Sequence, residues 1–177
     1  GIKRWKIGYC ASGKDANRII VPSFSLSGNV NYFIARSYKD NWKKYLNPPI
    51  SKDVIFNHLY IDWESDIIIV EGVFDAIVSG PNSIPILGST LKDTSNLFKE
   101  IVNNKCKIYI ALDPDAENKA MDLIYSLLEY GVEIRKVDIV PFGDVGEMSV
   151  KEFKYRKNNA PLITHNNYLF YKTTNSC

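Results

Sequence analysis

Two kinds of hydrophobic pattern alternate along the last two thirds of the chain. Continuous apolar runs occur within Asp66 to Ala76 and at Lys107 to Leu112, and they indicate strands that are buried on both faces of a sheet. A short strand is predicted at Ile84 to Leu87, and the last strand at Val132 to Val140. Segments with helical spacing separate these runs. The pattern therefore predicts an α/β fold, in which helices flank a mainly parallel sheet.

Two of the intervening segments have a clear helical pattern. One helix is predicted to begin at Thr90, because Thr90 and Asp93 have the spacing of a capping box. The other follows Asp115 and ends at Gly131, since glycine readily adopts the left-handed conformation found after a helix. The apolar stripes are Leu97, Phe98, Ile101 and Val102 in the first helix, and Ala120, Leu123, Ile124, Leu127 and Leu128 in the second.

The first third of the chain has the short runs of a small β structure. Residues 17–25 and 29–36 are β-type runs joined by a Ser-Gly-Asn turn, which predicts a hairpin. A polar segment with two prolines follows, and then a short apolar segment at 55–61. We therefore expect an α+β lobe at 1–62, an α/β domain at 63–149 and a basic, asparagine-rich tail at 150–177.

Composition argues against several classes of protein. The 177 residues are 45% hydrophobic, as in an ordinary globular protein. No run approaches the roughly 18 apolar residues of a membrane span, and the first residues lack the apolar centre of a signal peptide, so we expect a soluble, cytoplasmic protein. Cys10, Cys106 and Cys177 are far apart, which argues against a disulfide framework or a cysteine zinc site. His58 and His165 are isolated, which gives histidine-based catalysis little support.

Charge is distributed unevenly along the chain. Residues 1–60 contain ten Lys and Arg against three Asp and Glu, whereas residues 61–147 contain seven against sixteen. The basic third also contains many aromatic residues, of which most must be core and a few are available to stack on bases. This distribution favours a polyanion bound by the first lobe and a divalent cation bound by the second. A pair of solvated charged faces is the alternative.

Acidic side chains follow the two apolar runs. Glu71 and Asp75 come directly after the first run, and Asp113 and Asp115 come after the second. Each acid alone could be an ordinary helix cap. Because the carboxyl ends of parallel strands meet at one edge of a sheet, the four acids together predict a metal site there, and their oxygen ligands suit Mg²⁺ or Mn²⁺. A glycine-containing loop after the last predicted strand adds two further acids, Asp144 and Glu147.

These segments resemble the Toprim domain of DnaG-type primases, topoisomerases and some nucleases. The resemblance is based on VEGVFDA, ILGSTL, ALDPDAENKA and GDVGE, which occur in the order that the family uses. The preceding segments RIIVPSFSLSGNVNYFIARSY, KKYLNPP and IFNHLYI are similar to the basic RNA-polymerase lobe of bacterial and phage primases. The resemblance spans roughly residues 7–149 and implies a primase catalytic core, in which 63–149 is the catalytic domain.

The resemblance also implies roles for individual residues. Glu71, Asp113 and Asp115 would be the catalytic acids. In the basic lobe, a smaller set would contact template phosphates or the incoming nucleotide. The implied metal ligands are Glu71, Asp75, Asp113, Asp115, Asp144 and Glu147, and the implied nucleic-acid or nucleotide contacts are Arg18, Arg36, Lys43, Lys44 and Asn47.

Three departures from the family pattern affect this interpretation. Gly146 stands where many primases have another metal-binding aspartate, so the metal position near Asp144 is expected to be weaker. Asn118 replaces a usual glycine, which is tolerable because asparagine accepts the left-handed conformation. Asn57 and His58 stand where a lysine is usual, so that nucleotide contact is not expected here.

The function that follows is metal-dependent synthesis of short RNA primers on single-stranded DNA from ribonucleoside triphosphates. A replicative helicase and a zinc-binding module, in trans or in a longer chain, are the expected partners. Two alternatives use the same residues: a non-catalytic nucleic-acid-binding module and a Toprim nuclease. A type IA topoisomerase is disfavoured by the length of the chain, and a RecR-like clamp by the absence of four zinc-binding cysteines.

Overall fold

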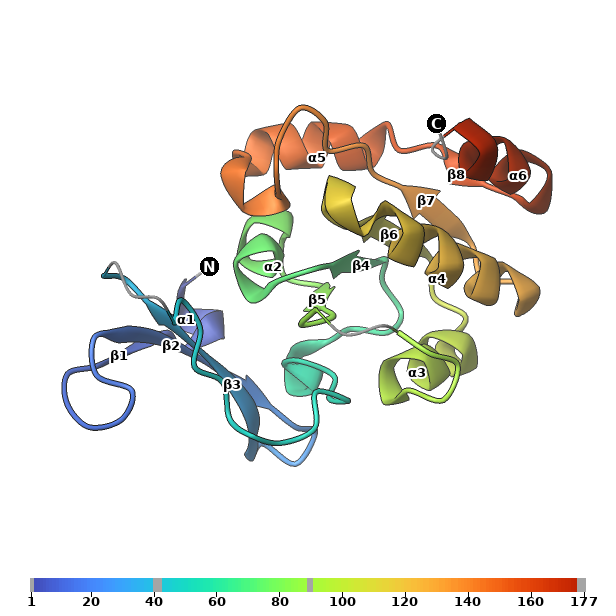
Figure 1. Cartoon of the computed structure of the whole chain (residues 1–177). Helices are drawn as coiled ribbons and strands as arrows, with labels where there is room; N and C mark the ends of the chain where they lie inside the picture. Colours follow the sequence, from blue (N-terminus) through green and yellow to red (C-terminus); the bar gives the residue numbers. More distant parts are fainter. Residues whose placement is uncertain (1, 40–42, 89–90, 175–177) are drawn as a thin grey trace. The chain divides into compact units, whose positions relative to one another are not determined.

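The strands of the chain form two separate sheets, and each sheet is the centre of one compact unit. The computed structural model describes residues 2–39, 43–88 and 91–174. The first unit is Gly1–Tyr60 and the second is Ile61–Cys177. Each unit is described here by itself (Figure 1).

The first unit contains an antiparallel sheet with the order β1-β2-β3. The predicted hairpin is confirmed, because Val21 pairs with Ile34 and Pro22 with Phe33 in antiparallel register, and Gly28 has a φ of 81° in the turn. Its core consists of buried side chains from the hairpin and from the segment at 55–61, which contains a short 3₁₀ helix. The elements are α1 (Ile2–Trp5), β1 (Gly8–Cys10), β2 (Arg18–Phe24), β3 (Val30–Ser37) and η1 (His58–Tyr60).

The second unit is built on a five-stranded sheet with the order β5-β4-β6-β7-β8. The first four of these strands are parallel to one another, and β8 is antiparallel to β7. All residues of β4 and β6 are buried, as the continuous apolar runs predict. The strands are β4 (Ile67–Val70), β5 (Ser83–Pro85), β6 (Ile108–Ala111), β7 (Ile134–Lys136) and β8 (Leu162–Ile163).

Helices flank this sheet, which confirms the α/β fold class. α2 packs against α5, and α4 packs against α6 (Figure 1). The six apolar residues that α4 buries include the whole predicted stripe, and Gly131 follows the helix with a φ of 71°. The helices are α2 (Val73–Ser79), α3 (Asn96–Asn104), α4 (Glu117–Glu129), α5 (Val150–Asn158) and α6 (His165–Thr174), and the short 3₁₀ turns are η2 (Pro114–Ala116) and η3 (Val145–Glu147). Among the described helices, none combines the length and the hydrophobicity that crossing a bilayer requires.

Strand order creates a crevice between β4 and β6. The chain leaves β4 toward β5 on one side, whereas it leaves β6 toward β7 on the other side. Adjacent parallel strands whose connections run in opposite directions leave an open crevice at their carboxyl ends, and ligands bind there in open α/β sheets. Residues that follow β4 and β6 therefore occupy the favoured position for a site.

Two element boundaries differ from the sequence prediction. The predicted helix start, Thr90, lies outside the described residues, but the helix itself begins only at Asn96, because Ser95 is the N-cap and accepts a hydrogen bond from the Phe98 amide. The predicted last strand at 132–140 is reduced to β7, because its pairing with β6 ends at Ile110 and Lys136. β7 is also not the last strand, since β8 pairs with it.

In the basic segment 150–177, which the sequence predicts as a tail, residues 150–174 form regular elements of the second unit. The segment contains α5, β8 and α6, and it buries Phe153, Ile163 and Tyr168. The Lys157 ammonium lies 4.1 Å from the ring centroid of Tyr109 in β6, so α5 is attached directly to the sheet. The sequence pattern did not predict this packing, because few apolar residues of the segment share one helical face.

Candidate functional site

Three carboxylates gather at the crevice between β4 and β6. Glu71 directly follows β4, and Asp113 and Asp115 flank the turn after β6. One ligand oxygen from each residue lies within 4.8 Å of the others. The strands fix this arrangement. Val70 of β4 pairs with Ala111 of β6, so the segments that follow the two strands leave the sheet at the same level. We call Glu71, Asp113 and Asp115 the acidic group.

The acidic group has free ligand atoms that fit a divalent cation. Glu71 Oε2 and Asp113 Oδ1 are buried and have no hydrogen-bond partner. A buried carboxylate oxygen without a partner costs free energy, and a bound cation would remove that cost. All of the donors are hard oxygens, so the group suits Mg²⁺ or Mn²⁺ better than Zn²⁺.

Electrostatics within the group lead to the same conclusion. Burial, together with the carboxylates of Asp75, Glu71, Asp144 and Asp115, raises the pKa of Asp113 to about 7. The shift arises because burial disfavours the ionised form and neighbouring negative charges disfavour it further. A divalent cation would reverse both effects, since it stabilises the ionised carboxylates.

Asp75 occupies a different environment from the acidic group. Its side chain is 7% exposed, and both of its oxygens accept backbone hydrogen bonds. Oδ2 accepts from the Gly72 amide at 2.8 Å, and Oδ1 accepts from the Gly146 amide at 2.9 Å. Burial raises the pKa of Asp75, whereas these two hydrogen bonds lower it. Asp75 lies at the predicted edge of the sheet, but both of its oxygens are bonded to backbone amides of the protein.

The two acids of the third segment are also outside the acidic group. Asp144 Oδ1 accepts the Glu147 amide at 2.9 Å as the N-cap of η3. Glu147 Oε2 accepts the Gly143 amide at 2.8 Å. Asp144 is still close enough to raise the pKa of both Asp75 and Asp113. Of the six predicted metal ligands, three form the acidic group, and the other three, Asp75, Asp144 and Glu147, accept hydrogen bonds from backbone amides.

Lys119 is a further residue at the acidic group, and the sequence analysis did not single it out. Its ammonium lies 3.9 Å from Glu71 Oε1, and its side chain is 45% exposed. The residue lies in the first turn of α4, one helical turn after Asp115. The sequence offers one signal for Lys119: it is four residues after Asp115, and residues four apart in a helix lie on the same face.

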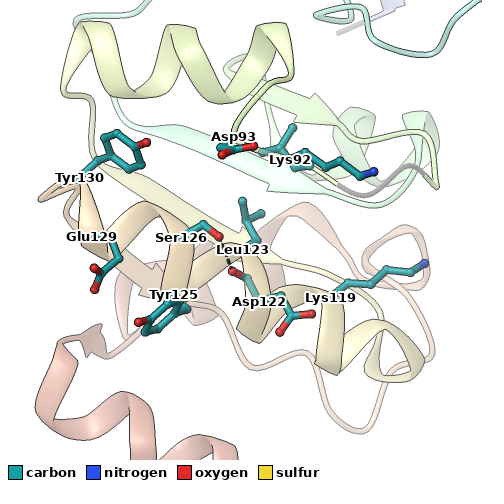
Figure 2. Close-up of a pocket in the computed structure, with 10 residues that line it drawn as sticks. Lys92, Asp93, Lys119, Asp122, Leu123, Tyr125, Ser126, Glu129 and Tyr130 are labelled. Atoms are coloured by element: carbon teal, nitrogen blue, oxygen red, sulfur yellow. Dashed lines mark hydrogen bonds between the residues drawn. The ribbon is translucent and has the colours of Figure 1, made fainter.

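Lys119 also lines a surface pocket of about 470 Å³ between the segment at 91–93 and α4. Figure 2 shows Lys92 and Lys119 extending toward one end of this pocket, while Tyr130 lies at the other end. The pocket has three acidic residues and two lysines. Lys119 connects it to the acidic group.

In the first unit, one predicted contact residue has a structural role. Arg18 is 4% exposed, and its guanidinium donates to the backbone oxygens of Lys43, Lys44 and Ala35 at 2.9, 3.2 and 3.4 Å. These bonds hold the segment after residue 42 against β3. These bonds favour a structural role for Arg18 over the predicted nucleic-acid contact, because its buried guanidinium is already bonded to carbonyls.

The other predicted contacts lie on or beside the segment that Arg18 holds. Arg36 is at the end of β3, forms an isolated bridge with Tyr45, and has its guanidinium 5.7 Å from the centroid of that ring. Lys43 and Lys44 are exposed. Asn47 Oδ1 is buried without a hydrogen-bond partner. The structure thus brings these four residues into one short stretch of the first unit.

Three tyrosines of the first unit present their rings to solvent. Tyr9, Tyr38 and Tyr45 are 55, 51 and 44% exposed, whereas Trp5, Tyr32 and Phe56 form part of the core. The rings of Tyr9 and Tyr38 are 5.6 Å apart, and their hydroxyls are hydrogen-bonded. Exposed rings among cations are the usual components of surfaces that bind single-stranded nucleic acid.

Comparison with known proteins shows which solved structures have a similar fold. No protein-family profile matches the sequence, and no curated protein matches it significantly. Solved structures of DNA primases do match. The zinc-binding and RNA polymerase domains of the Aquifex aeolicus primase align with a TM-score of 0.70 and 24% identity, over 93% of this chain and 47% of that one.

Two further structures give the same result. The Escherichia coli primase catalytic core aligns with a TM-score of 0.75 and 15% identity, over 97% of this chain and 71% of that one. A DnaG primase catalytic domain bound to single-stranded DNA aligns with a TM-score of 0.73 and 16% identity, over 97% and 72%. The chain therefore has a fold similar to that of primase catalytic cores, and it spans about half of the Aquifex aeolicus structure.

Proposed function

We propose that this chain is the catalytic core of a DNA primase, with a basic lobe followed by a Toprim domain, and that it synthesises short RNA primers on single-stranded DNA. The observation that carries the proposal is the acidic group. Three carboxylates, two of which have a buried oxygen without a hydrogen-bond partner, lie at the topological switch point of a fold similar to that of primase catalytic cores. Fold alone would leave the activity open, because one fold supports many functions.

Glu71, Asp113 and Asp115 would hold Mg²⁺ or Mn²⁺, with Asp144 beside them. When bound, such a metal lowers the pKa of an attacking hydroxyl and neutralises charge on the leaving pyrophosphate. The residues themselves supply placement: β4 and β6 fix the three carboxylates, so little reorganisation is needed at the moment of reaction. Lys119 adds a positive charge at the edge of the group, where a triphosphate would bring negative charge.

The first unit would bind the template or the incoming nucleotide. Arg36, Lys43 and Lys44 would contact phosphates, Asn47 would provide a polar contact, and the exposed tyrosines would stack on bases. A solved DnaG catalytic domain bound to single-stranded DNA supports this partner for a fold of this kind. The zinc-binding domain in the Aquifex aeolicus structure supports a zinc-binding module as a second partner, and we propose a replicative helicase as a third.

Primer synthesis tests the proposal directly. The protein is incubated with single-stranded DNA, labelled ribonucleoside triphosphates and Mg²⁺ or Mn²⁺, with and without a helicase, and Glu71→Gln is the matched control. We expect short RNA that depends on both template and metal. Metal-dependent cleavage of the template without RNA product would favour a nuclease. Tight binding of the template with neither product would favour a non-catalytic binding module.

A further inference from the structure

Asp75 connects two segments that are 71 residues apart in the chain. Its Oδ1 accepts the amide of Gly146, within the turn that carries Asp144 and Glu147, while its Oδ2 accepts the amide of Gly72, which precedes α2. Hydrogen bonds from backbone amides to a carboxylate are among the stronger bonds in proteins. A buried carboxylate requires such partners, and Asp75 has one for each oxygen.

The two glycines that face Asp75 lie close to its carboxylate oxygens. A Cβ on Gly72 would lie 2.9 Å from Asp75 Oδ2. A Cβ on Gly146 would lie 3.1 Å from Asp75 Oδ1 and 3.1 Å from Asp144 Oδ1. Gly146 is not among the glycines with positive φ, so close approach and not backbone conformation is the reason for glycine here. The Asp75 carboxylate and the Gly146 amide thus form a closely fitted contact.

We propose that Asp75 is a positioning residue, which holds the turn at 144–147 so that Asp144 lies beside the acidic group, and that it does not bind the metal itself. This inference rests on the proposed function, because it assigns a role within the same site. A Cβ at position 146 would require the carboxylate of Asp75 or Asp144 to shift by a few tenths of an ångström, which would disturb the contact between the two segments.

The inference is tested with Asp75→Asn, Gly146→Ala and the double variant. Asp75→Asn removes one acceptor, and Gly146→Ala disturbs the same contact while it keeps every carboxylate. Ser95→Ala is the control, because it removes a helix cap of the same unit that lies away from the contact. Amide exchange at position 146 is measured by NMR, Mn²⁺ binding by calorimetry, and primer synthesis by kcat and KM.

Each single variant should exchange the amide of residue 146 about three- to tenfold faster than wild type, and Ser95→Ala should not. Both should still bind Mn²⁺ with unchanged stoichiometry, and both should lower kcat while KM for the nucleotide changes by less than about twofold. The double variant should show about the same effect as either single variant, since both changes break the same interaction.

Two results would overturn the inference. One is a loss of Mn²⁺ binding in Asp75→Asn as complete as in Asp113→Asn, with exchange at residue 146 unchanged. The other is multiplication of the two single effects in the double variant. If wild-type protein makes no primers, the proposed function fails, but exchange and Mn²⁺ binding still decide the role of Asp75. If Asp75→Asn does not fold, Gly146→Ala gives the same exchange and binding readouts.

Discussion

In the second unit, charged groups are fixed by the ends of buried strands, whereas in the first unit they lie on an exposed segment that a buried arginine holds in place. Glu71 and Asp113 follow strands in which every residue is buried. Lys43 and Lys44 are exposed and are held through their backbone carbonyls by Arg18. A small metal ion requires ligands at fixed positions, while a flexible polyanion tolerates cations that move. The two units therefore suit the two partners that we propose for them.

The largest expected effect is on Glu71. Glu71→Gln keeps the shape of the side chain but removes a charge that would hold a cation, so primer synthesis should fall at least about 10³-fold. Binding of single-stranded DNA, which we assign to the first unit, should change by less than about twofold. Both are measured on protein whose circular dichroism matches wild type. Primer yield close to wild type would remove Glu71 from the site.

Arg18 tests whether the first unit depends on its buried cation. Arg18→Met removes the guanidinium donor from the Lys43 carbonyl and one of the donors from the Lys44 and Ala35 carbonyls, which also accept backbone amides. It should lower the free energy of unfolding of this unit by about 1 to 3 kcal/mol. Amide exchange should speed up in β2 and β3, and it should stay unchanged in β4 and β6. Lys14→Met, at an exposed position of the same unit, is the control. Equal exchange in the two variants would contradict the structural role.

Asp113 tests the electrostatics of the second unit. Burial and neighbouring carboxylates raise its pKa to about 7, so the metal-free folded protein holds this proton more tightly than the unfolded chain does. The stability that the bound proton contributes is fully present below the unfolded pKa of about 4 and is lost as the pH rises through about 7. The melting temperature of metal-free wild type should fall over this range, and that of Asp113→Asn should fall less. Asp122→Asn, an exposed position on α4, should behave like wild type.

Added metal tests the same carboxylate through the stability that metal binding contributes. In calorimetry near pH 8, Mn²⁺ at about a hundredfold over its dissociation constant should add about 2.7 kcal/mol of stability to wild type. Asp113→Asn should lose most of this gain, and Asp144→Asn should lose less, because Asp144 lies outside the acidic group. An equal gain in wild type and Asp113→Asn would make Asp113 an ordinary helix cap.

The smallest effect is expected on the exposed cations. Lys43→Ala combined with Lys44→Ala should flatten the log–log dependence of single-stranded DNA affinity on salt by about 0.7 to 1.4, because each lost phosphate contact contributes about 0.7. Affinity should fall similarly for all sequences, since phosphates carry no sequence information. Fluorescence anisotropy over a range of salt concentrations measures this slope. An unchanged slope would place the DNA contact elsewhere.

The sequence by itself determined the elements in which one pattern dominates. β4, β6 and α4 were predicted because burial on both faces requires continuous apolar runs, and because a helix on a sheet requires an apolar stripe. Their order along the chain was enough to place Glu71, Asp113 and Asp115 at one edge of the sheet. The hairpin of the first unit was predicted for a similar reason, since its turn residues and β-type runs agree.

Sequence was less informative where local signals compete. Thr90 and Ser95 are both acceptable caps, and α3 begins after Ser95, where its buried stripe starts at Leu97. The segment 150–177 has a polar composition, yet Phe153, Ile163 and Tyr168 are buried by residues far away in the chain. No local pattern records such contacts, because they depend on the faces that other elements leave open.

Only the tertiary structure decided how acids and cations of the same type are used. Asp75 and Asp113 are both acids that follow a buried strand, but one is satisfied by two backbone amides and the other has an unpaired oxygen. Arg18 and Arg36 both belong to the hairpin, but one is buried against carbonyls. Residue type and spacing determine which groups reach an edge. Their hydrogen-bond partners, which come from distant segments, determine which groups remain available for a ligand.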